Sequence, residues 1–309
     1  MSEAKAAAAS SLLSRRRLLA GASLTVGALI GGLTASVACA SDSAAGSEKP
    51  RGTGEARVVV RPDAVEAPEE LAPGPVTFHA ATPADSSMSV LLIRLKAPLR
   101  KYLADLKAMG AAQSPEDKAA AAAKVEADAD NLGGAVLLPG EQTVSFTQVL
   151  LPGRYYLIGY AYDTPGAEPV AHRLTVEGVP GAAAPRVDGL VLQTPSGFTV
   201  PGGTLSADGD LLVVNRSGAL NEAVLIPVRP GTTTEDVDAF FAALAEGQQP
   251  PSAPFVGKSS GLAPLSPGRF ARLRTGLEPG EYLLSSWVTS TDTGRPRAFD
   301  GFYRLVRLT

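Results

Sequence analysis

The sequence predicts an all-β protein made of two tandem Greek-key β-sandwiches, each with a short helical insertion, with a signal helix before the first sandwich. One observation is a phrase of the form Leu-x-Pro-Gly-x-Tyr, which occurs once as Leu150–Tyr155 and again as Leu277–Tyr282. A second is composition: 32 glycines and 25 prolines among 309 residues break the chain into short apolar runs. Short runs bounded by turn residues are typical of β-strands.

The repeated phrase predicts a tyrosine corner in each half of the chain. Proline fixes φ at the first turn position, and glycine supplies the positive φ that follows. The tyrosine at the start of the next strand then reaches back to bond a backbone group of the crossing. Such corners are found in Greek-key β-sandwiches, and two of them predict two sandwiches.

Further repeats predict where the two halves begin and end. The predicted strand at 92–96 corresponds to the one at 225–229. Each is followed by an amphipathic helix with apolar residues at the i, i+3, i+4 and i+7 positions. The first half carries an extra helix at about 114–131, begun by Ser114 and Pro115. We expect sandwiches at 56–178 and 187–309, joined by a linker at 179–186 that is rich in proline, glycine and alanine.

Charge and cysteine content exclude some classes of function. Four of the 28 basic and one of the 31 acidic residues lie in residues 1–38, so the rest of the chain has 24 basic and 30 acidic side chains and a net charge of −6. A mildly acidic chain without a basic stripe does not indicate nucleic-acid binding. The single cysteine, Cys39, precedes the predicted fold, so no disulfide forms within the chain.

Residues 1–38 are predicted to be an export signal. Ser14 to Leu19 resembles the twin-arginine motif, with Arg15 and Arg16 as its arginine pair, and a moderately apolar stretch follows. The end of this stretch, Ser36-Val37-Ala38-Cys39, resembles a lipobox, in which the cysteine receives a diacylglycerol. We expect Cys39 to be lipidated, residues 39–55 to form a disordered tether, and the protein to lie on the extracytoplasmic face of the membrane. Cleavage at an A-x-A site, with secretion, is the alternative.

Both halves resemble the cupredoxin-like proteins exported by bacteria, and the second half is the better match. The resemblance covers most of residues 70–309. It rests on five features in order, namely Asn215-x-Ser217-Gly218, a strand that opens near Asn221, the helical crossing, the tyrosine-corner phrase, and the stretch from Gly294-x-Pro296 to Gly301. The resemblance implies a Greek-key scaffold, and in copper-binding members two histidines, a cysteine and usually a methionine hold the metal.

This chain departs from the family at each copper-ligand position. In the second half these positions are Asn221, Ser286, Arg297 and Phe302. In the first half the corresponding places near Ser87 and at Gly159 also carry no ligand. We therefore expect no cofactor and no blue-copper centre.

Other candidates for chemistry have structural explanations that we prefer. His79 and His172 lie in predicted strands with no acid or nucleophile beside them. Glu126, Asp128 and Asp130 alternate as in a calcium loop, but the required glycine and final glutamate are missing, so a solvated helix end is expected. A nucleophilic role for Ser285 or Ser286 is not expected without a Gly-x-Ser-x-Gly turn. These weak signals predict that the chain is not an enzyme.

Aromatic residues supply the remaining candidate surface. Tyr156, Tyr160 and Tyr162 share one face of their predicted strand, and Trp287 takes the place of Tyr160 in the second half. They form either a docking stripe or a face covered by the helical insertion. The first hypothesis is a non-catalytic, membrane-anchored module that binds an envelope protein or a surface polymer, and the second is a metal-handling envelope protein that uses carboxylates with His79 or His172. A structural spacer or assembly factor is an alternative that the sequence does not separate from the first, and an enzyme ranks third.

Overall fold

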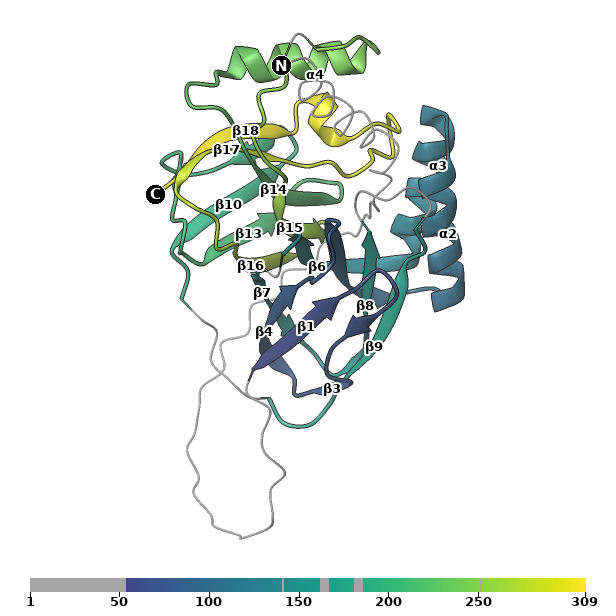
Figure 1. The fold of residues 1–309 in the computed structure, drawn as a ribbon. Coiled ribbons are helices and arrows are strands. Elements are labelled where there is room, and N and C mark those ends of the chain that lie inside the picture. Colours follow the sequence, from purple (N-terminus) through teal and green to yellow (C-terminus); the bar gives the residue numbers. More distant parts are fainter. Residues whose placement is uncertain (1–53, 141, 162–166, 181–185, 251) are drawn as a thin grey trace.

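The structure, a computed structural model, describes residues 54–140, 142–161, 167–180, 186–250 and 252–309 (Figure 1). The predicted export signal, Cys39, most of the predicted tether and Tyr162 lie outside these residues. The described residues form two large sheets and three α-helices, which confirms the all-β class. No helix in the described ranges is long and apolar enough to cross a membrane.

One sheet of the sandwich has eight strands in the described part of the chain, in the order β11 (Gly197–Thr199), β10 (Gly189–Thr194), β13 (Leu211–Asn215), β16 (Phe270–Arg274), β7 (Val144–Leu150), β4 (Gly74–Ala81), β1 (Glu55–Val60) and β2 (Val65–Glu66). The other sheet has ten, in the order β12 (Thr204–Leu205), β18 (Tyr303–Leu308), β17 (Gly280–Ser285), β14 (Asn221–Pro227), β15 (Ser260–Leu265), β6 (Ala129–Leu137), β5 (Met88–Leu95), β8 (Gly153–Ala161), β9 (Val170–Val176) and β3 (Glu70–Leu71).

Each half of the chain has the same Greek-key connections. In the first half, β1 pairs in parallel with β4 and β3 in parallel with β9, while the other pairs are antiparallel. In the second half, β10 pairs in parallel with β13 and β12 with β18 in the same way. Parallel neighbours require the chain to cross between the sheets, and these crossings make each half a cupredoxin-like sandwich.

The two halves share both sheets. Strand β7 pairs antiparallel with β16, and β6 pairs antiparallel with β15. Phe146 lies opposite Leu273, and these two residues occupy equivalent places in the repeat, 127 positions apart. Pairing of equivalent residues is the mark of a two-fold, isologous contact. The halves are therefore related as the subunits of a symmetric dimer, which the repeat alone did not reveal.

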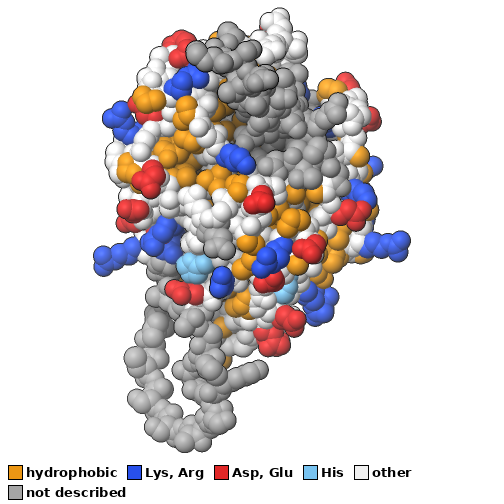
Figure 2. Space-filling view, in the orientation of Figure 1, with side chains coloured by type: hydrophobic (Ala, Val, Ile, Leu, Met, Phe, Trp, Pro, Cys, Tyr) orange, Lys and Arg blue, Asp and Glu red, His pale blue; other side chains and the backbone are white. Residues whose placement is uncertain are grey.

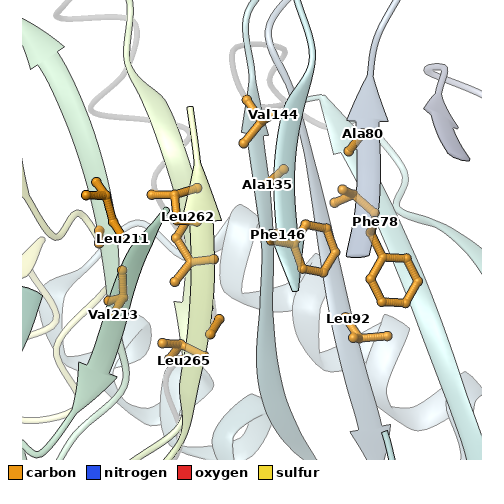
Figure 3. Packing of buried hydrophobic residues seen from close by; sticks show 14 of the residues in the cluster. Phe78, Ala80, Leu92, Ala135, Val144, Phe146, Leu211, Val213, Leu262 and Leu265 are labelled. Atoms are coloured by element: carbon orange, nitrogen blue, oxygen red, sulfur yellow. The ribbon is translucent and has the colours of Figure 1, made fainter. Parts of the chain in front are cut away.

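A continuous core fills the space between the sheets. Phe78 of β4 and Phe146 of β7 stack with ring centroids 4.9 Å apart. Figure 3 shows these rings in the first half and Leu211, Val213 and Leu262 in the second half as parts of the same cluster. Burial of apolar side chains from both halves in one cluster ties the halves together.

All helices of the described residues belong to the side of the ten-stranded sheet. Two apolar clusters join its outer face to α2 (Leu99–Ala111) with α3 (Pro115–Asp128) and to α4 (Thr234–Ala245), respectively. In Figure 1, α2 and α3 lie beside the first half and α4 beside the second. The eight-stranded sheet contributes to neither cluster, so no described helix packs on its outer face.

The helix ends follow from capping residues. Thr233 and Asp236 form the predicted capping box of α4, and the Ser114 hydroxyl accepts the Asp117 N–H at the start of α3. The extra helix ends at Asp128 and not near Asn131, because residues from Ala129 onward enter β6. The predicted end was therefore three residues too late.

Both tyrosine corners are formed. The Tyr155 hydroxyl donates to the Leu151 carbonyl at 2.8 Å and also accepts the Leu151 N–H at 3.1 Å. The Tyr282 hydroxyl donates to the Glu278 carbonyl at 2.8 Å. The positive φ predicted for the glycine is found in Gly153, at 149°, but the second copy makes its turn without it.

Candidate functional site

The aromatic residues of the predicted stripe lie under the helices. Tyr156 and Tyr160 pack against the cluster beneath α2 and α3, and burial raises the pKa of the Tyr160 hydroxyl well above its usual value. Trp287 is only 6 % exposed, 5.6 Å from the ring of Phe241 in α4, and its Nε1–H donates to the Ser285 hydroxyl. Tyr156, Tyr160 and Trp287 are therefore covered by the helices, and they do not form an open docking stripe.

The acidic triplet is buried and paired, which corrects the expectation of a solvated helix end. Lys101 of α2 donates to Asp128 at 2.6 Å. Arg269, from the second half, donates through Nε to Asp130 at 3.2 Å. Glu126 is 5 % exposed. These carboxylates therefore hold helices and halves together.

The two histidines are in different sheets. His79 lies in β4, where its Nδ1 is 2.9 Å from the Ser145 hydroxyl. His172 lies in β9, with Nε2 3.2 Å from the Pro68 carbonyl. No group of three or more histidine, cysteine, aspartate or glutamate side chains is suitably placed for a metal ion within the described ranges. No specific observation favours the metal-handling hypothesis.

The four positions implied by the cupredoxin resemblance do come together at one end of the second half. The first of these positions, Asn221, is held by hydrogen bonds within the loop before β14, where Asn215 and Ser217 are buried. The Asn215 amide donates to the Ala219 and Leu265 carbonyls at 2.8 and 2.7 Å. Ser217 donates to Asn215 and accepts from the amide of Asn221, each at 2.7 Å. This network fixes the start of β14.

Backbone hydrogen bonds bring the other three positions together. The Ser286 N–H donates to the Phe302 carbonyl at 3.1 Å, and the Phe302 N–H donates to the Arg297 carbonyl at 3.0 Å. A single 3₁₀ turn, η1 (Arg297–Asp300), lies between them and ends at Gly301 with φ of 86°. The Arg297 guanidinium carbon lies 4.9 Å from the centroid of the Phe302 ring, a cation–π contact.

A pocket of about 320 Å³ opens beside Arg297. Its walls come from the β10–β11 turn, from the loop after β17 and from η1. Burial lowers the pKa of the Arg297 guanidinium, and Asp300 and Asp292 oppose this by attraction. Arginine remains charged at neutral pH in any case. The polar side chains that line the pocket are Ser196, Ser290, Asp292, Thr293, Arg297 and Asp300.

These polar groups offer both donors and acceptors. The Arg297 Nε is buried and donates to no acceptor in the described part of the chain. Thr293 donates to Asp300 at 2.9 Å, and the Ser290 hydroxyl accepts the Asp292 and Thr293 N–H groups. The pocket thus combines a guanidinium, two carboxylates and three hydroxyls in a small volume.

A buried carboxyl group lies behind this pocket. Glu222 is 4 % exposed, its Oε1 accepts the Trp287 N–H at 2.8 Å, and its own N–H donates to the Ser286 hydroxyl at 3.3 Å. Burial raises the pKa of Glu222 to about 7. The sequence analysis noted the opening of a strand at this point but not a buried acid. The only signal available was the period of two, which turns Glu222 to the side opposite Ala223.

The residues at the copper positions do not fit copper. An amide, a hydroxyl, a guanidinium and a phenyl ring replace the two imidazoles, the thiolate and the thioether. Arg297 in particular places a fixed positive charge where a cation would bind. No step of chemistry is assigned to copper here.

Comparison with known proteins gives likenesses at the level of structure alone. No family model matches the chain, and no curated protein matches it. A multicopper oxidase aligns at 10 % identity and a TM-score of 0.22, over 82 % of this chain and 88 % of the other. A copper-containing nitrite reductase from Thermus scotoductus aligns at 12 % and 0.20, over 82 % and 60 % of the two chains. A multicopper oxidase from Aquifex aeolicus aligns at 10 % and 0.23, over 84 % and 66 %.

These names contradict one prediction. The structures that align with the chain are oxidases and a reductase, so the prediction that the chain is not an enzyme is contradicted and is dropped. At TM-scores near 0.2 the same likenesses assign no activity to this chain. The fold rests on the strand order described above.

Proposed function

We propose that the chain is a lipid-anchored binding protein on the extracytoplasmic face of the cell membrane, and that the pocket beside Arg297 is its ligand site. The ligand is a neutral, hydroxyl-rich group, such as a sugar unit of a surface polymer. The observation that carries the proposal is the mixed lining of the pocket, which offers charged donors and charged acceptors within about 320 Å³.

The lining favours a neutral ligand over an ion. An anion in the pocket would be attracted by Arg297 but repelled by Asp292 and Asp300. A cation would be attracted by the two carboxylates but repelled by Arg297. Hydroxyl groups donate and accept, so a sugar ring satisfies both kinds of partner at once. The unpaired Nε of Arg297 gains a hydrogen bond on binding, which removes the cost of a buried donor without an acceptor.

The location in the cell rests on the sequence of the first 40 residues. Arg15 and Arg16 support export, and Cys39 supports a lipid anchor. Fifteen residues after Cys39, the described chain begins at Gly54 and enters β1, the strand next to the edge strand β2 of the eight-stranded sheet. A tether of this length allows the body of the protein to meet polymers outside the membrane.

Binding of the purified full chain to an array of neutral oligosaccharides tests the proposal. We expect binding that Arg297→Ala weakens roughly tenfold or more, because a charged donor is lost from a buried position. Arg307→Ala is the matched control, since it also removes an arginine of the second half, but an exposed one paired with Glu281. A Cys39→Ala variant should no longer be found in the membrane fraction, and it should still bind the glycan.

Three outcomes would overturn parts of this proposal. Absence of glycan binding would remove the sugar ligand. Equal binding by the Arg297→Ala and Arg307→Ala variants would place the ligand elsewhere. Capture of one envelope protein in a manner that depends on Arg297 would replace the polymer by a protein partner.

A further inference from the structure

A second concave surface lies in the first half. It is a groove of about 700 Å³ at the corner of the eight-stranded sheet, where β1, β2 and β4 meet. Its floor and walls include Arg57, Val59, Arg61, Glu66, His79 and Thr143. None of the helices in the described part of the chain packs on this sheet.

The strand register gathers the cationic side chains on one face. Arg57 of β1 lies directly opposite His79 of the parallel strand β4. Arg61 follows Arg57 by four positions, so the period of two keeps it on the same face. Three nitrogen-bearing side chains therefore share one small area. On the face drawn in Figure 2, acidic and basic side chains are interspersed.

Among the described residues, Glu66 is the one carboxylate that lines the groove, and it is already paired. Glu66 accepts from Arg61 Nε at 2.8 Å. Arg57 is exposed and makes no ion pair within the described residues. The lining of the groove has two guanidinium groups and one carboxylate, and Asp63 outside the lining also attracts Arg61. This balance differs from that of the pocket beside Arg297, where two carboxylates face one guanidinium.

The histidine is held in one orientation. Its Nδ1 is 2.9 Å from the Ser145 hydroxyl, and in the tautomer whose Nδ1 accepts from that hydroxyl, the Nε2–H is the donor left for a ligand. A guanidinium fork and an imidazole N–H are donors that match the oxygens of a phosphate or carboxylate. Val59, Ala81 and Pro83 add apolar wall, so the volume suits an anionic group carried on a larger organic molecule.

We infer that this groove is a binding site for a phosphate or carboxylate group, with Arg57, Arg61 and His79 as its donors. The site is separate from the pocket of the proposed function and shares no residue with it. Its ligand chemistry has two possible sources, namely the headgroup of an anionic lipid and a soluble or polymer-borne phosphate.

Titration and vesicle flotation separate these sources. The full chain carrying Cys39→Ala, which cannot be lipidated, is titrated with glycerol 3-phosphate and with glycerol as the uncharged control. The same protein is floated with vesicles of phosphatidylcholine, with and without phosphatidylglycerol. We expect binding that Arg57→Ala weakens roughly tenfold through loss of one charge-assisted hydrogen bond. Arg307→Ala serves as the control, because it removes an exposed arginine that lines neither the groove nor the pocket beside Arg297.

Each outcome bears on the inference. Binding of glycerol 3-phosphate that depends on Arg57 supports a soluble or polymer-borne ligand. Flotation only with phosphatidylglycerol, again lost in the Arg57→Ala variant, supports a lipid headgroup. The inference is wrong when neither probe binds, or when the Arg57→Ala variant binds both probes as well as the Arg307→Ala variant and the parent protein do. Failure of the glycan experiment above would leave these readings unchanged.

Discussion

At the scale of single residues, buried polar groups decide how the second half is built. Glu222 occupies the place in the repeat that Ser89 occupies in the first half, 133 positions earlier. Its carboxylate accepts a hydrogen bond from the Trp287 N–H. A serine could not reach as far. The cost is a carboxyl group removed from water, which favours its neutral form.

This cost predicts a pH dependence of stability. The pKa of Glu222 is about 7 in the folded chain, against 4.5 without burial, so the folded state binds its proton more tightly than the unfolded state does. Stability from this group is therefore complete below pH 4.5 and is lost as the pH rises to about 7, by roughly 3 kcal/mol. Glu222→Gln keeps the acceptor for Trp287 and should abolish this loss.

Urea unfolding of the parent and the Glu222→Gln variant between pH 4 and 8 measures the effect. The difference in unfolding free energy between the two proteins should grow in favour of the variant as the pH rises. Glu281→Gln is the control, because hydrogen bonds from Arg307 and from the Gly231 N–H lower the pKa of Glu281, so its difference from the parent should change only at the acidic end of this range. A difference for Glu222→Gln that does not change with pH would show that the carboxyl group is not buried as described.

At the scale of elements, the loop that walls the Arg297 pocket is seated on a helix of the other half. Gly294 has φ of 64°, and a Cβ placed on it would lie 1.8 Å from the Pro115 carbonyl at the start of α3. The first-half insertion therefore supports the second-half pocket. Helix α3, which has no counterpart in the second copy of the repeat, thus supports the loop at Gly294.

Gly294→Ala should separate this loop from α3. Gly268→Ala is the matched control, because Gly268 has a similar φ of 74° but nothing within 4 Å of an added Cβ. Both variants incur the left-handed strain of roughly 1–2 kcal/mol. Gly294→Ala should lose about 1–3 kcal/mol more, because a backbone carbonyl must move. Equal losses in urea unfolding would mean that the loop is not held against α3.

The elements also show what could and could not be predicted from the sequence. Tyrosine corners, the Thr233 capping box and the Ser114 cap depend on residues within a few positions of one another, and each was predicted correctly. The end of α3 was not, because the chain there enters β6, whose partner β15 lies in the other half. Non-local pairing leaves no local signal.

The candidate site shows the same division. The order of the cupredoxin-like features placed Asn221, Ser286, Arg297 and Phe302 in sequence, and the structure brings them together. The pocket itself could not be predicted, because Ser196 of the β10–β11 turn lies about a hundred positions from Arg297. The covered aromatic rings required knowledge of where the helices pack, which periodicity does not give.

At the scale of the whole molecule, the two-fold relation between the halves removes exposed sheet edges. Strands β6 and β7 of one half and β15 and β16 of the other would each be an edge if the halves were apart. Contacts between side chain and backbone reinforce the junction. The Gln148 amide donates to the Leu132 carbonyl of its own half and to the Phe270 carbonyl of the other, each at 2.5 Å, and Ser266 accepts the Asn131 N–H at 2.9 Å.

The junction predicts that the halves behave as one folding unit and stay together without a covalent link. A protease site placed in the linker at 179–186 allows the full chain to be cut after folding. We expect the two fragments to co-elute in gel filtration, and the intact chain to unfold in urea as a single transition by both tyrosine fluorescence and circular dichroism. The reason is that separation would expose four strands and divide a core that is continuous across the halves. Fragments that separate without denaturant, or two resolved transitions in the intact chain, would show that the shared sheets contribute little.

The Arg269 to Asp130 ion pair, which also crosses the junction, should contribute less than the strands, because the Arg269 side chain is 46 % exposed and water screens the pair. Arg269→Ala should therefore leave the cut fragments associated.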